Sequence, residues 1–490
     1  MEIQDFSSRK AVADIDCIAI CPAYPEYLVY GTYTIVRREE DEDISAQVRT
    51  GTIQVLPVEP DFRPSFAGCP RRPRLCEQSF PAAVLDIRFH PNDGSLLGAA
   101  LSDGTIHFFR FFKRADVLHR RWVTELHPLG HAKVAEKDAE TGRLRVVTQF
   151  QWLPALHEVG RLDVSNTLTV TIAATLDSGV VKLLRTNIPA IRSTMDQRMV
   201  LPPVRLEAST ETIHTHSLEA WCIALVGVPK LSNMQVLLSG GDDSNILVSI
   251  VTMLDPASSP SLSTSTVSRS APTDLFSAEV PAPTVCFKGR RTHEAGVTAI
   301  LPLPPPPTSN RRIPSSVSVA VPTPVLTGSY DDKIRLFCLS PTSHKLNHQP
   351  LVSRDLLDGV WRLQLMDQYT VIVTEARKHN AMIILRYQQH YIILVSCMNG
   401  GAKILRVIIT SYHEQVDDVD WKWETEIRKE AEFIKGHGTV VYACDFVRHW
   451  RIAEPEAEPG VGTEIAPRRG YNTQQMSVMR YGTGLDGQCW

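Results

Sequence analysis

The sequence predicts an all-β protein, a seven-bladed WD40-like β-propeller with Pro/Ser-rich loop insertions, in one domain over residues 1–490. Two observations predict this fold. Short apolar runs recur seven times along the chain, and each is followed by a polar turn that carries Gly or Asp. Helical periodicity is scarce. Repeated strands joined by tight turns, without intervening helices, are typical of a propeller.

Residues 293–340 show one repeat most clearly. An alternating apolar run at 297–303 predicts an inner strand, which a histidine introduces at its start. A Pro-rich interruption follows, then a second run at 324–329, a polar turn at 330–333 and a third run at 334–339. Two strands around an Asp-rich turn, after an upstream strand, describe one blade.

The same pattern identifies the other blades. Three inner strands superpose without a gap, and four weaker copies follow: 15–22, 84–91 and 147–154, then copies that begin at Ala220, Val297, Val360 and Val441. Their turns are predicted at Thr50-Gly51, Ser102-Asp-Gly104, Asp177-Ser-Gly179, Gly240-Gly-Asp-Asp243, Ser329-Tyr-Asp-Asp332, Met398-Asn-Gly-Gly401 and Leu485-Asp-Gly487.

The turns are spaced more widely than the roughly 40 to 45 residues of a WD40 blade, so insertions are expected. Residues 253–284 are of low complexity, 302–324 are Pro-rich, and 453–469 are rich in Pro, Glu and Gly. Such segments bury too little apolar surface to fold alone, and we expect solvated loops. Residues 420–435 are charged but lack an apolar stripe, so a helix there is disfavoured. We also expect an N-terminal segment to complete the last blade and close the ring.

Composition excludes several classes of function. The 51 basic and 54 acidic residues give a net charge of -3, which argues against direct binding of nucleic acid. The N-terminus has no apolar signal-peptide region, and polar residues interrupt the most apolar candidate span, 381–398. Ten cysteines at irregular spacings suggest reduced thiols, with no zinc signature. We therefore expect a cytoplasmic, monomeric protein that needs no membrane, metal or cofactor.

Longer motifs carry a family resemblance over nearly the whole chain outside the insertions. They are D-C-I-A-I-C-P at 16–22, A-A-V-L-D-I-R-F-H-P at 82–91, H-S-L-E-A-W at 216–221 before L-S-G-G-D-D, H-E-A-G-V-T at 293–298 before T-G-S-Y-D-D-K-I-R-L, G-V-W-R-L at 359–363, V-S-C-M-N-G-G at 395–401 and H-G-T-V-V-Y-A-C-D-F at 437–446. In this order they resemble the WD-repeat diphthine methyl ester hydrolases of diphthamide biosynthesis. The Trp-Asp dipeptide itself is absent, with Phe337-Cys338 and Val248-Ser249 in its place, and Asp358 stands where a glycine is expected.

The resemblance implies an enzyme. Its reaction would be hydrolysis of the methyl ester of methylated diphthine, a modified histidine on translation elongation factor 2, which leaves a carboxylate for a later amidation. The partner would then be a folded protein docked on a propeller face. The alternative is a non-catalytic WD40 scaffold for protein–protein interaction, since no catalytic motif is evident. A ubiquitin-ligase substrate receptor would need an adaptor-binding segment that the sequence does not display.

The sequence contains no G-x-S-x-G elbow and no H-E-x-x-H motif, and its one G-x-G-x-x-G match, at 482–487, is followed by too few residues for a helix. Histidines do precede three inner strands, namely His216, His293 and His437. Histidine, hydroxyl and Asp groups at these positions commonly brace propeller blades, and one histidine freed from that role would be a general base.

His216 is the better candidate base, because Glu219 is close enough in the sequence to orient it. For His293 the bracing pattern already looks complete through Ser329 and Asp331. His216 and Glu219 are therefore one candidate catalytic pair.

Alignment of the inner strands gives a second candidate set. One register holds Cys17, Asp86, Gln149, Cys222 and Arg362, with Ala299 and Ala443 in the two remaining blades. If this register faces a central channel, Asp86 and Arg362 supply an acid and a base beside two thiols. If it faces the neighbouring blade, Asp86 and Arg362 are structural, and loss of a buried partner costs about 3 to 5 kcal/mol.

Three further residues complete the candidates. Cys397 is either a thiol nucleophile or a packing residue, since free cysteines are among the most buried side chains. Trp221 and Trp361 begin inner strands and either form an aromatic wall that binds substrate or fill the core.

Overall fold

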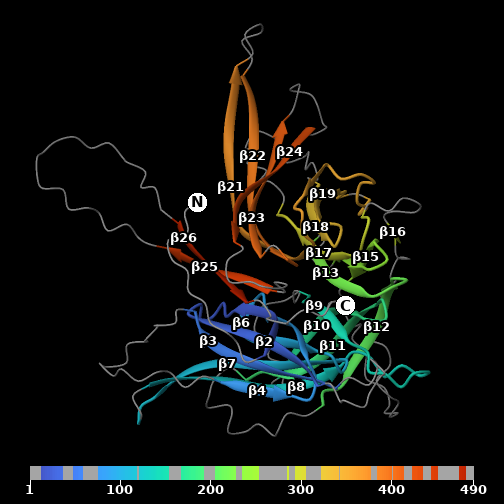
Figure 1. The fold of residues 1–490 in the computed structure, drawn as a ribbon, viewed down its shortest axis with the longest axis vertical. Helices are drawn as coiled ribbons and strands as arrows, with labels where there is room; N and C mark the ends of the chain where they lie inside the picture. The colour runs from blue at the N-terminus through green and yellow to red at the C-terminus, as the bar shows by residue number, and fades with distance from the viewer. Residues whose placement is uncertain are drawn as a thin grey trace, which may run out of the picture.

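The computed structural model describes residues 13–36, 48–58, 76–118, 121–153, 167–191, 205–227, 234–252, 284–285, 293–304, 322–341, 343–376, 383–399, 401–412, 422–433, 443–450 and 474–481. Over these residues the chain forms seven antiparallel sheets, six of four strands and one of two (Figure 1). The predicted all-β, WD40-like propeller is confirmed.

The first four sheets follow the chain from its N-terminal side. They contain β1 (Asp14–Ile20), β2 (Tyr27–Val36), β3 (Val48–Pro57) and β4 (Glu77–Phe80); β5 (Val84–His90), β6 (Asp93–Leu101), β7 (Thr105–Asp116) and β8 (Arg121–Lys133); β9 (Val147–Trp152), β10 (Thr167–Leu176), β11 (Val180–Pro189) and β12 (Ala208–Thr215); β13 (Ala220–Gly227), β14 (Met234–Gly241), β15 (Ile246–Thr252) and β16 (Thr284–Val285). In each sheet the strands pair in chain order.

The last three sheets continue the same order. They contain β17 (Val297–Pro302), β18 (Thr323–Ser329), β19 (Lys333–Leu339) and β20 (Val352–Asp355); β21 (Val360–Ala376), β22 (Ile383–Cys397), β23 (Ala402–Tyr412) and β24 (Lys422–Phe433); β25 (Ala443–Trp450) and β26 (Gln474–Tyr481). β24 occupies the charged stretch for which a helix was disfavoured.

The seven predicted inner strands are β1, β5, β9, β13, β17, β21 and β25, and five of them begin at the predicted residue. Each inner strand contacts the next, and β1 also contacts β25, so the seven form a closed ring. The Ile20 amide donates a hydrogen bond to Asp445 Oδ2 at 2.7 Å across this closure. The N-terminal residues predicted to complete the last blade lie outside the described chain.

Most of the predicted turns are confirmed. Gly104, Gly179 and Gly401 have positive φ values in the turns of their sheets, and Asp332 has a φ of 63°. The prediction of a turn at Thr50-Gly51 is wrong, because both residues lie within β3. An added Cβ on Gly51 would lie 2.3 Å from the carbonyl oxygen of Thr32, so this glycine permits close backbone contact. The turn at 485–487 lies outside the described residues.

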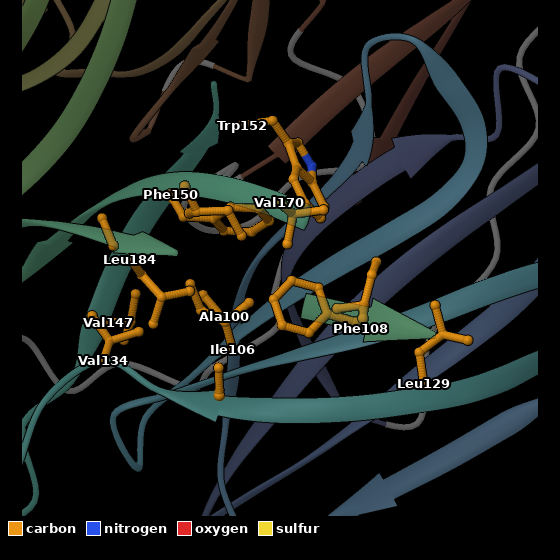
Figure 2. Packing of buried hydrophobic residues seen from close by; sticks show 14 of the residues in the cluster. Ala100, Ile106, Phe108, Leu129, Val134, Val147, Phe150, Trp152, Val170 and Leu184 are labelled. Carbon is orange, nitrogen blue, oxygen red and sulfur yellow. The ribbon is translucent and has the colours of Figure 1, made fainter. Parts of the chain in front are cut away.

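Apolar side chains fill the spaces between neighbouring sheets. Figure 2 shows the cluster between the second and third sheets, where Phe108, Phe150 and Trp152 are fully buried. Gly98 makes room for it, because an added Cβ would lie 2.8 Å from the Phe150 ring. Each buried side chain of this size contributes about 1.5–3 kcal/mol.

The sixth sheet is extended by a long β21–β22 hairpin that projects from the ring (Figure 1). The predicted insertions lie almost entirely outside the described residues. Where the chain is described, it has no helix long and apolar enough to cross a membrane. Its seven described cysteines are free thiols, and five of them are buried.

Candidate functional site

A β-bulge near the start of the inner strands creates a ring of aligned side chains. In six of the seven strands the pairing register skips one residue directly after the first paired residue or, in β1, after the second. The skipped residues are Asp16, Leu85, Thr148, Trp221, Thr298 and Trp361. A bulge leaves its extra residue unpaired and redirects the side chain. These six residues therefore occupy one level on the face of the ring where the inner strands begin.

The two threonines at this level tie blades together. Thr148 Oγ1 donates to the carbonyl oxygen of Ala220 at 2.5 Å, and Thr298 Oγ1 donates to that of Val360. Both threonines are buried, whereas the other four residues at this level are partly exposed. The positions open to solvent therefore carry one carboxylic acid, one leucine and two tryptophans.

The next residue of each inner strand belongs to the register predicted to hold Asp86, and it faces the neighbouring blade. The Phe150 amide donates to Asp86 Oδ2 at 3.1 Å, and the Ile223 amide donates to Gln149 Oε1 at 2.8 Å. Cys222 Sγ likewise donates to the Val297 carbonyl at 3.4 Å. For Asp86, Gln149 and Cys222 these hydrogen bonds favour the interblade alternative over a catalytic channel.

Arg362 is the partly exposed member of this register. Asp86 pairs with Arg88, whose Nε lies 2.9 Å from Asp86 Oδ2, rather than with Arg362. The Arg362 guanidinium lies 5.7 Å from the centroid of the Trp361 ring, and the residue is partly exposed. Arg362 is therefore a cation at the face where the inner strands begin.

Asp16 is a functional candidate that the sequence analysis missed. Burial raises the pKa of Asp16 to about 7, Arg362 opposes that rise, and Asp86 adds to it. A carboxyl group with this pKa exchanges its proton near neutral pH, as a general base must. The available signal was its alignment with Trp221 and Trp361, one residue before the register that was considered.

The structure brings Trp221 and Trp361 together. Their ring centroids lie 5.9 Å apart at an interplanar angle of 53°, and Tyr330 lies 5.9 Å from Trp361 at 39°. All three residues are partly exposed. Asp242 lies beside them, and burial raises its pKa while the Trp221 indole opposes the rise. These contacts favour the aromatic wall over complete burial in the core.

His216 lies in a buried hydrogen-bonded chain. Its Nδ1 lies 2.9 Å from Asp243 Oδ1, and its Nε2 lies 2.8 Å from Ser239 Oγ. Ser239 also lies 2.5 Å from Nε2 of His214. The order Ser-His-Asp is that of a hydrolase triad. However, the His216 side chain and Ser239 are fully buried, so the geometry favours bracing.

Asp243, not Glu219, orients His216. Burial would raise the pKa of Asp243, but hydrogen bonds from His216 and from the Asn245 and Ser217 amides lower it to about 2. Glu219 is partly exposed and acts electrostatically on Asp242 instead.

His293 is braced differently from the prediction. Its Nε2 lies 3.0 Å from Thr327 Oγ1, whereas Ser329 Oγ donates to the Ala295 carbonyl at 3.1 Å. Asp331 Oδ2 accepts the Glu294 amide at 2.8 Å. The hydroxyl partner was therefore misassigned by two residues, although the bracing role holds. His437 lies outside the described residues.

Cys397 is fully buried in the core between the fifth and sixth sheets. Burial raises the pKa of its thiol to about 12. The reactive thiolate is therefore scarce at neutral pH, and the geometry favours packing. Among the described residues, no group of three or more His, Cys, Asp or Glu side chains could hold a metal ion.

Seven antiparallel sheets in a closed ring, with hydrogen-bonded histidines bracing the fourth and fifth, define a WD40-like β-propeller. The chain is a distant homologue of a Saccharomyces cerevisiae protein named diphthine methyltransferase. The two are 24% identical over 392 residues, which cover 77% of this chain and 80% of the relative. No family model matches the sequence.

Solved structures resemble this one more weakly. Sqt1 from Chaetomium thermophilum gives a TM-score of 0.38 at 13% identity, with 82% of each chain covered. Sqt1 bound to the N-terminus of the ribosomal protein L10 gives 0.37 at 12% identity, with 81% of this chain and 84% of the other covered. The fold assignment therefore rests on the sheets and their order.

Proposed function

We propose that this protein hydrolyses the methyl ester of methylated diphthine on translation elongation factor 2. The observation that carries the proposal is the homology over 392 residues to a yeast protein whose name refers to diphthine. Two of the motifs that resemble diphthine methyl ester hydrolases contain Asp16 and Arg362.

In the proposed reaction Asp16 is the general base. Its carboxylate takes a proton from a water molecule, and the water oxygen attacks the ester carbonyl carbon. The bond between that carbon and the methoxy oxygen then breaks, and the proton passes from Asp16 to this oxygen, which leaves as methanol. The new carboxylic acid releases its proton to solvent. Arg362 stabilises the negative charge that develops on the carbonyl oxygen and afterwards the product carboxylate.

The remaining candidates receive other proposed roles. His216 and Asp86 position blades through their buried hydrogen bonds, and Cys397 packs in the core. Glu219 adds negative charge beside the aromatic side chains. The substrate protein would dock on the face where the inner strands begin, in the cytoplasm where translation takes place.

The test incubates the purified protein with elongation factor 2 that carries methylated diphthine and follows the mass of the modified peptide. Loss of the ester methyl group is the expected result. Unchanged mass with intact binding would favour a scaffold. Gain of a methyl group in the presence of a methyl donor would favour methyl transfer, the activity in the yeast relative's name.

Two matched variants sharpen the assay. Asp16→Asn removes the proposed base and should lower the rate by about 10²- to 10⁴-fold. Asp14→Asn changes a carboxyl group on the same strand, outside the bulge, and should retain activity. Equal rates for the two variants would remove Asp16 from the mechanism.

A further inference from the structure

We propose that Trp221, Tyr330, Trp361 and Asp242, together the aromatic cluster, bind a methylated ammonium group. The cluster spans three successive sheets, since its members come from β13, the turn after β14, the turn after β18, and β21. Two ring pairs with centroids 5.9 Å apart connect the fourth, fifth and sixth blades at the face where the inner strands begin.

The backbone fixes the members of the cluster. The two tryptophans are the bulged residues of their strands, which directs both side chains to the same level. Asp242 and Tyr330 occupy equivalent positions in successive turns, where their amides donate to the carbonyls of Glu219 at 2.8 Å and Gly296 at 3.1 Å. These bonds hold the two turns beside the starts of the inner strands.

Gly296 lets the acid and the phenol approach each other. An added Cβ there would lie 2.3 Å from Asp242 Oδ1 and 3.1 Å from Tyr330 Cδ2. The carboxylate and the Tyr330 ring therefore lie on either side of a backbone that has no side chain between them.

The charges around the cluster suit a cation. The carboxylates of Glu219 and Asp243 act electrostatically on Asp242, so three acidic side chains lie near one another here. Aromatic ring faces attract cations as well, and the Arg362 guanidinium already lies 5.7 Å from the Trp361 centroid. Rings and carboxylates thus favour the same sign of charge.

The chemistry of the surface distinguishes between cations. A lysine ammonium carries three N–H donors that require acceptors, and among the four side chains of the cluster only the Asp242 carboxylate and the Tyr330 hydroxyl accept. A fully methylated ammonium has no such donors, so it loses little hydration on reaching the rings, and its methyl groups contact them. The cluster therefore suits a quaternary ammonium better than a primary one.

The position of the cluster connects it to the reaction. Trp361 and Arg362 are adjacent, and Arg362 is also the cation that acts on Asp16. One substrate could therefore place its ester at Arg362 and Asp16 and its ammonium group in the cluster. In that respect the inference rests on the proposed function.

The test titrates the full chain with choline and, separately, with 3,3-dimethylbutan-1-ol, the neutral analogue of the same shape, and follows tryptophan fluorescence. Choline should bind about 2- to 30-fold more tightly, because a cation–π contact contributes about 0.5–2 kcal/mol. Asp242→Asn should weaken choline binding, and Asp332→Asn, in the turn of the next blade, should not. Trp361→Phe keeps an aromatic ring and should weaken binding without unfolding the protein.

Equal affinity for the two ligands, no saturable binding of choline, or equal effects of the two Asp variants would overturn the inference. The outcome is separable from the enzyme assay. Choline binding without ester hydrolysis would support the cluster and contradict the proposed function. Ester hydrolysis without choline binding would contradict the cluster alone.

Discussion

At the scale of single residues, the bulge position decides what each inner strand presents at its start. A threonine there donates to the next blade and closes the gap between them, as Thr148 and Thr298 do. An aspartate or a tryptophan there leaves its functional group at the face instead. One backbone irregularity thus supplies both a structural tie and the proposed chemistry.

The raised pKa of Asp16 predicts that its replacement changes the melting temperature in a pH-dependent way. Its pKa is about 7 in the folded protein against 3.8 in an exposed carboxyl, so its contribution to stability is fully present below pH 3.8 and lost as pH rises through 7. Asp16→Asn, which is uncharged, should therefore gain melting temperature relative to the wild type between pH 5 and pH 8. Wild-type ester hydrolysis should decline below pH 7 as the base becomes protonated.

Asp14→Asn is the control for this measurement. Burial raises the pKa of Asp14 as well, so this variant shows how the melting temperature responds when another carboxyl group of the same strand is removed. A melting temperature of Asp16→Asn that follows the wild type at every pH would contradict the assigned ionisation.

At the scale of the elements, the sequence predicted the inner strands well because their apolar runs alternate and end at polar residues or proline. β5, β9, β13, β17 and β21 begin where the pattern places them. Gly51 led to the wrong prediction of a turn, because a glycine in a turn and a glycine that permits close backbone contact look alike in a sequence. The sequence did not predict the β21–β22 projection, because polar residues interrupt its apolar pattern.

The candidate site was less predictable. The Ser239 partner of His216 lies 23 residues away, and only pairing of β13 with β14 brings the two together. Asp16 became a candidate because a bulge displaces it by one position, and its alignment with Trp221 and Trp361 does not by itself reveal a bulge. Trp221 and Trp361 were predictable, because both directly begin recognisable inner strands.

The turn after β10 allows a test of a single glycine. Gly179 has a φ of 80°, and an added Cβ would lie 2.4 Å from the Leu218 carbonyl oxygen. Gly142 has a φ of 66° but has nothing within 4 Å of its added Cβ. Gly142→Ala should therefore cost only about 1–2 kcal/mol of left-handed strain, and Gly179→Ala should cost clearly more.

Urea unfolding of the two glycine variants measures this difference. Equal losses of unfolding free energy would show that the turn after β10 relaxes away from Leu218. A larger loss for Gly142→Ala would contradict the role assigned to the close contact.

At the scale of the whole molecule, stability depends on closure, because an open ring would expose the inner strands at both ends. β1 and β25 are far apart in the sequence yet contact each other. The Ile20 amide and the Asp445 carboxylate form a hydrogen bond of 2.7 Å between them. Buried apolar residues on both sides, including Ile18 and Ala443, pack in one cluster across this contact.

Replacement of Asp445 tests the closure. Burial raises its pKa to about 6, although the amides of Ile20 and Phe446 and the side chain of Gln364 oppose the rise, so its contribution to stability decreases as pH rises through 6. Asp445→Leu removes an acceptor worth about 1.5–3 kcal/mol and should speed amide exchange in β1 and β25 by roughly 10- to 100-fold.

Asp445→Asn keeps an acceptor oxygen for Ile20 without the charge. It should therefore hold exchange near the wild-type rate and abolish the pH dependence. Exchange in β10, on a distant blade, should be unchanged in both variants. Equally fast exchange in every sheet of the Leu variant would mean that the ring unfolds as one unit rather than opening at this contact.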